Sequence, residues 1–77
     1  MDYANKVVAI TGGARGIGLA MAQAFHARGA QIALADLDEA ETAAETFDGL
    51  GMTVDVAVEG QVAEFIQKTE AVLGPID

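Results

Sequence analysis

The sequence predicts an α/β fold in which three parallel strands alternate with three helices. Two short runs without polar alternation, Val7 to Ile10 and Ile32 to Ala35, are typical of parallel strands that helices cover on both faces. Between them, apolar residues recur at helical spacing. A chain of 77 residues forms at most one small domain, so we expect these units to share one sheet.

The first strand is predicted over residues 6–11, after a polar lead of residues 1–5 that we expect to be frayed. The first helix is predicted over residues 17–28, and Gly29 ends it as a C-cap. Its apolar stripe, expected to be the packed face, consists of Ile17, Ala20, Met21, Ala24 and Phe25. His26, the only histidine, falls outside this stripe, and we interpret it as a solvated residue rather than a ligand or base.

A glycine-rich loop, Thr11-Gly12-Gly13-Ala14-Arg15-Gly16-Ile17-Gly18, joins this strand to this helix. Glycines at positions 12, 16 and 18 let the backbone turn sharply and bring helix N–H groups close to a pyrophosphate, where the helix dipole favours an anion. A bare structural turn is the alternative for glycine spacing alone. The strand before the loop, the helix after it and an acidic residue about 20 positions further on favour a dinucleotide site.

That acidic residue is Asp36, which ends the second predicted strand, residues 31–36. A carboxylate at this point can accept hydrogen bonds from an adenosine ribose and repels a 2′-phosphate, so Asp36 favours NAD over NADP. Alternatively, Asp36 only caps the following helix. Arg15 is open to two interpretations as well, a phosphate partner or a surface arginine at the loop apex.

Two further units follow in the second half of the chain. Residues 38–47 predict a short helix, residues 48–51 a turn, and residues 53–56 the third strand. A third helix is predicted from Gln61 to the Gly74-Pro75 stop, with an apolar stripe of Val62, Phe65, Ile66, Thr69, Val72 and Leu73. Neither Ala57 nor Val58 can accept a capping bond, which leaves the start of this helix without a predicted cap.

The form Thr-Gly-x-x-x-Gly-x-Gly at residues 11–18 resembles the cofactor loop of the short-chain dehydrogenase/reductase family. Asp36 after the second strand, Asp55-Val56 after the third, and the ending Leu73-Gly74-Pro75-Ile76-Asp77 agree with the resemblance along nearly the whole chain. It implies a Rossmann-like three-layer sandwich, half of a doubly wound parallel sheet with strand order 3-2-1. The residues predicted to bind NAD(P) are Gly12, Arg15, Gly16, Ile17, Gly18, Asp36, Leu37, Asp55 and Val56, the last two at the adenine end.

The family's catalytic residues are not found in this sequence. The resemblance implies an Asn-Asn-Ala-Gly stretch after a fourth strand, then a catalytic Ser and a Tyr-x-x-x-Lys pair, but the chain contains no Ser, and Val7 stands four positions after Tyr3. We therefore predict no catalytic residue here. We expect residues 1–77 to be the N-terminal part of one NAD(P)-binding domain, inactive alone, from an NAD-dependent oxidoreductase. That enzyme would transfer hydride between nicotinamide and an alcohol or carbonyl substrate.

Composition narrows the alternatives. The formal net charge of −8 argues against nucleic acid as a partner. The absence of Cys excludes thiolate metal sites, and no metal site is predicted. No apolar run approaches the roughly 20 residues that span a bilayer, so we expect no membrane partner and a cytoplasmic location.

Two other functions stay open. The first is a freestanding, non-catalytic nucleotide-binding half domain, which could form a homo-oligomer through the exposed first strand. The second is the start of an S-adenosylmethionine-dependent methyltransferase, whose sheet also carries a glycine loop and a ribose-binding acid. An ATPase-type phosphate loop is excluded because no Gly-Lys followed by Ser or Thr occurs.

Overall fold

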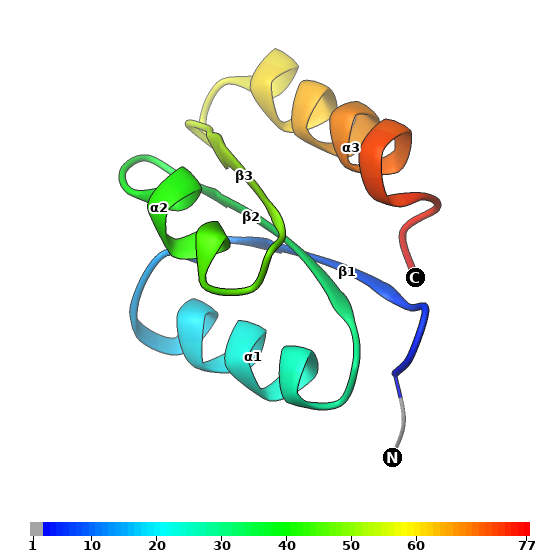
Figure 1. Cartoon of the computed structure of the whole chain (residues 1–77). Coiled ribbons are helices and arrows are strands. Elements are labelled where there is room, and N and C mark those ends of the chain that lie inside the picture. The colour runs from blue at the N-terminus through cyan, green and yellow to red at the C-terminus, as the bar shows by residue number, and fades with distance from the viewer. Residues whose placement is uncertain (1–2) are drawn as a thin grey trace.

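A computed structural model describes residues 3–77, which fold into three layers with one central sheet (Figure 1). The elements are β1 (Val7–Thr11), α1 (Gly16–Ala27), β2 (Gln31–Asp36), α2 (Ala40–Glu45), β3 (Leu50–Thr53) and α3 (Glu59–Leu73). All strands are parallel, and β2 lies between β1 and β3. The predicted Rossmann-like α/β fold with strand order 3-2-1 is confirmed.

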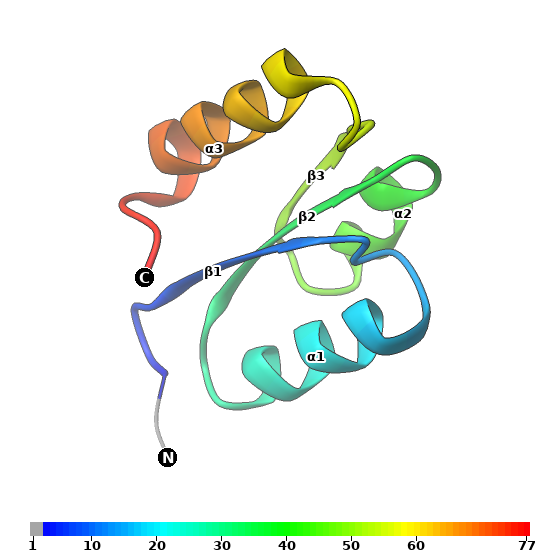
Figure 2. The ribbon, with the colours of Figure 1, turned by 180° about the vertical axis from the view of Figure 1, so that it is seen from behind.

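The two faces of the sheet carry different helices. Helices α1 and α2 pack on one face and α3 packs on the other, as the two opposite views show (Figures 1 and 2). Strand β2 alternates between the layers because successive side chains point to opposite faces. Ile32 and Leu34 pack toward α1 and α2, whereas Ala33 and Ala35 pack toward α3, where Phe65 fills the space that the small side chains leave. This strand is buried on both sides, as its unbroken apolar run predicts.

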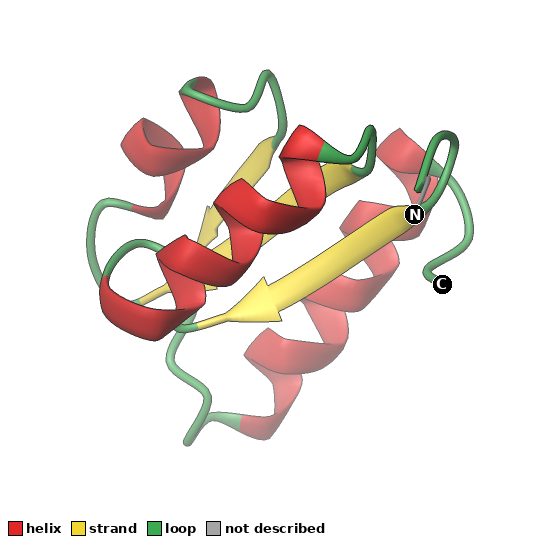
Figure 3. Ribbon diagram, turned by 90° about the horizontal axis from the view of Figure 1, so that it is seen from below, coloured by secondary structure: helices red, strands yellow, loops and turns green. Residues whose placement is uncertain are grey.

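The parallel register brings the carboxyl ends of the three strands to one edge of the sheet. Thr11 pairs with Ala35, and Asp36 pairs with Thr53. The view from below shows α1 in front of the sheet and α3 behind it (Figure 3). The loops that follow the strands therefore meet at a common edge, which is where ligands bind in open α/β sheets.

The expected packed face of α1 is wrong. Ile17 and Met21 are 81% and 46% exposed, whereas Ala22 is fully buried against the sheet and Leu19 is partly buried. Of the predicted stripe, Phe25 alone packs against this core. The helix is apolar around most of its circumference, so periodicity does not specify one face, and close approach of the small Ala22 to the sheet decides the orientation.

The third strand lies earlier than predicted. Its residues are Leu50–Thr53, which include two positions expected to form a turn, and residues 54–56 follow its end. Gly51 lies inside this strand. A Cβ at position 51 would overlap the backbone of Ala40, so β3 can approach α2 closely only with glycine there. Val54 continues the pairing by one hydrogen bond from its N–H to the Asp36 carbonyl, at 2.8 Å. Asp55 consequently lies in the loop at the carboxyl edge.

Other boundaries differ by a few residues. Helix α2 is shorter than the predicted 38–47, and α3 starts at Glu59, before Gln61. In the predicted α3 stripe, Phe65 and Thr69 are buried and Val62 and Leu73 partly buried, but Ile66 and Val72 are exposed. The reason is that α3 packs through the narrower face centred on Phe65.

Within the lead, residues 3–5 are not frayed, while the first two residues lie outside the described part of the chain. The Tyr3 N–H donates to the Arg28 carbonyl at 2.8 Å, and the Tyr3 ring packs edge-on against Phe25 with centroids 5.3 Å apart. These contacts hold the lead against the end of α1. Across residues 3–77, no helix is both long enough and apolar enough to span a bilayer.

Candidate cofactor site

All the predicted cofactor-binding residues lie at or just after the carboxyl ends of the three strands. The β1–α1 loop and the first turn of α1 contain five of them, Gly12, Arg15, Gly16, Ile17 and Gly18. The end of β2 and the residue after it are Asp36 and Leu37, and the β3–α3 loop contains Asp55 and Val56. Because the strands are parallel, these three segments are neighbours at one edge of the sheet.

The glycine-rich loop is a tight turn fixed to β2. Residues 12–15 form the turn, and the N–H groups of Gly12 and Gly13 both donate to the Ala35 carbonyl, at 2.7 and 3.3 Å. Gly12 and Gly16 adopt φ values of 67° and 62°, in the left-handed region that favours glycine. A Cβ on Gly18 would overlap the carbonyl of Gly12, so the loop can fold back on α1 only with glycine at position 18.

This turn leaves the start of α1 open. Arg15 occupies the N-cap position with extended backbone and no side-chain cap, and the first turn carries no acidic residue. Among residues 3–77, the N–H groups of Gly16, Ile17 and Gly18 have no hydrogen-bond acceptor. Unpaired amides at the positive end of a helix dipole are the donors that an anionic phosphate requires.

Asp36 points toward this loop. One carboxylate oxygen, Oδ2, accepts from the Ala14 N–H at 3.0 Å, and the other, Oδ1, accepts from the Leu37 N–H at 2.7 Å. Helix α2 begins later, with Glu39 at its N-cap position, so Asp36 does not cap it. Each carboxylate oxygen has a second lone pair, and the half-buried carboxylate can therefore accept further bonds from hydroxyl groups.

Three exposed apolar side chains lie along the same edge. Ile17 is 81% exposed, Leu37 57% and Val56 62%, although each belongs to a different loop or helix start. Exposed apolar side chains beside a few polar groups are typical of small-molecule sites, where the ligand covers them. Arg15 is also exposed and makes no ion pair with any of residues 3–77, which is compatible with both of its interpretations.

The β3–α3 loop holds Asp55 through two bonds. Its N–H donates to Oε1 of Gln61 at 2.8 Å, and its Oδ1 accepts from the Ala57 N–H at 2.9 Å. Sequence reasoning missed Gln61, whose side chain reaches back from the first turn of α3 to the loop before it. The missing cap at residues 57 and 58 did not point to it, because a cap accepts from the first N–H groups of α3 whereas Gln61 accepts from Asp55.

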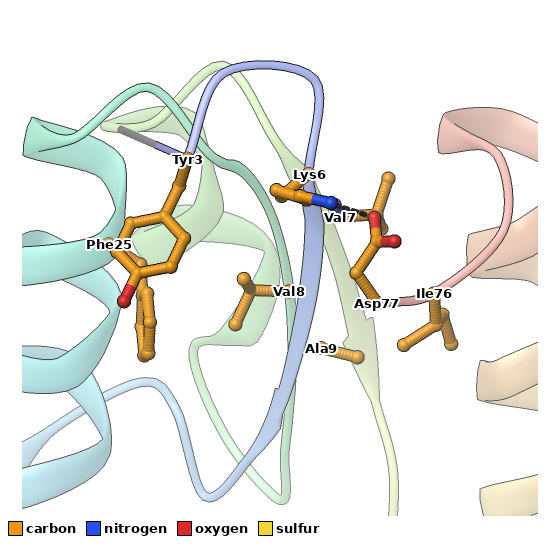
Figure 4. A pocket seen from close by; sticks show the side chains of 8 residues that line it. All are labelled: Tyr3, Lys6, Val7, Val8, Ala9, Phe25, Ile76 and Asp77. Carbon is orange, nitrogen blue, oxygen red and sulfur yellow. Dashed lines mark hydrogen bonds between the residues drawn. The ribbon is translucent and has the colours of Figure 1, made fainter. Parts of the chain in front are cut away.

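A cavity of about 380 Å³ lies elsewhere, along the outer side of β1 (Figure 4). Figure 4 shows Tyr3 and Phe25 on one side of it and Ile76 and Asp77 on the other. The Asp77 N–H donates to the Val7 carbonyl at 3.0 Å, and Asp77 Oδ2 accepts from the Val7 N–H at 3.0 Å. No predicted cofactor residue lines this cavity, so it is separate from the glycine-rich loop.

Known protein families include one whose model matches most of this chain. The family model described as short chain dehydrogenase matches residues 6–77, and so includes all six strands and helices. The chain belongs to the short-chain dehydrogenase family. Membership in this family implies a nicotinamide dinucleotide as the cofactor.

Proteins from several organisms resemble the chain over nearly its whole length. An L-fucose dehydrogenase of Rattus norvegicus is 41% identical, over 97% of this chain and 29% of its own length. A galactitol 2-dehydrogenase of Agrobacterium fabrum is 42% identical, over 100% of this chain and 32% of its own length. An uncharacterized oxidoreductase of Thermotoga maritima is 38% identical, over 95% of this chain and 31% of its own length. The chain thus spans less than a third of the length of these relatives.

Proposed function

We propose that this chain is the NAD-binding portion of a short-chain dehydrogenase/reductase. The observation that carries the proposal is the bond from the Ala14 N–H to Asp36 Oδ2, because it places a carboxylate beside a loop that opens onto free helix amides. The amides of Gly16, Ile17 and Gly18 suit the pyrophosphate, and Asp36 suits the hydroxyls of an adenosine ribose. Asp55 and Val56 suit the adenine.

The preference for NAD over NADP follows from charge. A 2′-phosphate bound at the same ribose would stand against the Asp36 carboxylate, whose oxygens already accept from two backbone N–H groups that hold it in place. Arg15, exposed at the loop apex, could offset part of this repulsion through a phosphate contact. We propose that Asp36 dominates, because hydroxyl groups satisfy its lone pairs and a phosphate does not.

The bound dinucleotide would supply the hydride acceptor or donor, and an alcohol or carbonyl compound would be the substrate. No Ser is present, and Tyr3 packs on Phe25 beside the end of α1, at the amino ends of the strands. The residues of this chain therefore bind and orient the cofactor, and we propose that the chemistry depends on residues of a longer polypeptide in which this chain is the N-terminal part. That the relatives are more than three times longer supports this arrangement.

Calorimetric titration of the protein tests the proposal with three ligands. We expect NAD to bind more tightly than NADP, with hydrogen-exchange protection of the amides of residues 16–18, and no competition from S-adenosylmethionine. Displacement of NAD by S-adenosylmethionine would favour a methyltransferase instead. Absence of heat and of amide protection with both dinucleotides would refute the cofactor assignment.

A further inference from the structure

Helix α3 begins without the side-chain cap that a helix start usually has. Val58 stands at its N-cap position, with an extended backbone and no side-chain hydrogen bond. Ser, Thr, Asp or Asn at this position would satisfy an N–H group of the first turn. A different arrangement must therefore fix the path of the chain between β3 and α3, where Asp55 and Val56 are found.

Gln61 provides that arrangement. Its Oε1 accepts from the Asp55 N–H at 2.8 Å, and this contact joins the first turn of α3 to the residue next after the buried Val54. Backbone bonds from the Val58 N–H to the Asp55 carbonyl at 2.9 Å and from the Gln61 N–H to the Val58 carbonyl at 3.0 Å close the same loop. Both Gln61 and Asp55 are half-buried, so water competes only partly for their bond.

The bond fixes the backbone of Asp55, and the Ala57 N–H orients its side chain from that fixed position. The backbone of Asp55 is held by Gln61 on one side and by Val54 on the other, since the Val54 N–H donates to the Asp36 carbonyl. Asp55 Oδ1 is then occupied by the Ala57 N–H, while Oδ2 has no hydrogen-bond partner among residues 3–77. Oδ2 is therefore available to accept from a ligand, and the exocyclic amine of adenine is a donor of the matching kind.

We infer that Gln61 is a positioning residue for adenine recognition: it holds Asp55 so that the carboxylate can accept from the 6-amino group. The inference rests on the proposed function. A purely structural role, in which Gln61 only stabilises the start of α3, predicts a different result. Loss of helix stability lowers the folded fraction equally for every ligand, whereas misplacement of Asp55 changes the preference between bases.

The experiment compares NAD with nicotinamide hypoxanthine dinucleotide, in which an oxo group replaces the 6-amino group. Equilibrium titrations of the protein give the ratio of the two dissociation constants, and thermal melts record stability separately. The variants are Gln61→Met, which has a similar shape but no strong acceptor, and Gln61→Glu, which keeps an acceptor oxygen. If Gln61→Met does not fold, Gln61→Asn, one methylene too short to reach the Asp55 N–H, serves in the same comparison.

We expect wild type to prefer NAD, Gln61→Met to lose about three- to tenfold of this preference, and Gln61→Glu to recover it. A ratio that is the same in Gln61→Met and wild type, or no preference in wild type, would overturn the role of Gln61. Failure of wild type to bind either dinucleotide would instead refute the proposed function, so the two failures are distinguishable.

Discussion

Replacing Asp36 with Ala tests the cofactor preference most directly. The carboxylate accepts from the Ala14 and Leu37 N–H groups at 3.0 and 2.7 Å and keeps a lone pair on each oxygen for a ribose hydroxyl. A hydrogen bond to a charged group contributes about 1.5–3 kcal/mol. Loss of the equivalent of one such bond weakens NAD roughly 10- to 150-fold.

The same substitution acts on NADP in the opposite direction. Asp36→Ala removes the negative charge that a 2′-phosphate would meet, so NADP affinity should hold or increase while NAD affinity falls. The ratio of the NADP and NAD dissociation constants should therefore fall by at least the factor lost for NAD. Titration of both dinucleotides against wild type and variant, by calorimetry or by quenching of a reporter dye, measures this ratio.

Asp38→Ala is the matched control. Asp38 is exposed, lies two positions after Asp36 in the loop that follows β2, and carries the same charge, but it makes no hydrogen bond to the glycine-rich loop. Its substitution measures the effect of net charge alone and should leave the preference nearly unchanged. An equal shift in Asp38→Ala, or an unchanged preference in Asp36→Ala, would refute the assignment of Asp36 to the ribose.

Three further substitutions test the packing that supports the site. Gly18→Ala should destabilise the protein by about 1–3 kcal/mol and weaken NAD and NADP alike, because the added methyl overlaps the Gly12 carbonyl; unchanged binding and stability would contradict the loop geometry. Gly60 lies in the first turn of α3 with open space around it, so Gly60→Ala should stabilise the protein by up to about 1 kcal/mol in urea denaturation. A loss of stability would contradict the open space at this position. Phe65→Ala should cost about 3–5 kcal/mol in the same assay, since this side chain is 1% exposed between α3 and the sheet; a cost below about 1 kcal/mol would mean that α3 is not docked there.

Much of the site could be predicted because its parts are local in sequence. The turn at residues 12–15, the start of α1 after it and Asp36 at the end of a buried strand each depend on a few adjacent residues. The bond from Ala14 to Asp36 could not be predicted, since it joins residues 22 positions apart and depends on how the loop crosses the end of β2. Gln61 was missed for a different reason: it lies only six positions after Asp55, but glutamine has no strong preference for bonding to a preceding loop.

The errors in the fold also have a physical pattern. A strand was predicted over residues 53–56 although Asp55 interrupts it, yet β3 is Leu50–Thr53, with Gly51 inside it. Isolated glycine predicts a turn, and only the close approach of the Ala40 backbone explains its place in a strand. In α1, apolar residues around most of the helix left the packed face undetermined, and Ile17 proved exposed at the carboxyl edge.

The sequence by itself determined the order of strands and helices, the parallel sheet and the loop that opens onto α1. These follow from the lengths of apolar runs, from the handedness of strand–helix–strand crossovers and from glycine at positions that other residues rarely adopt. Only the tertiary structure decided which face of α1 is buried, where β3 begins and how Gln61 holds Asp55. The first two features depend on contacts between segments that are distant along the chain, and the third on a side-chain bond across the β3–α3 loop. Neither kind of contact leaves a periodic signal in the sequence.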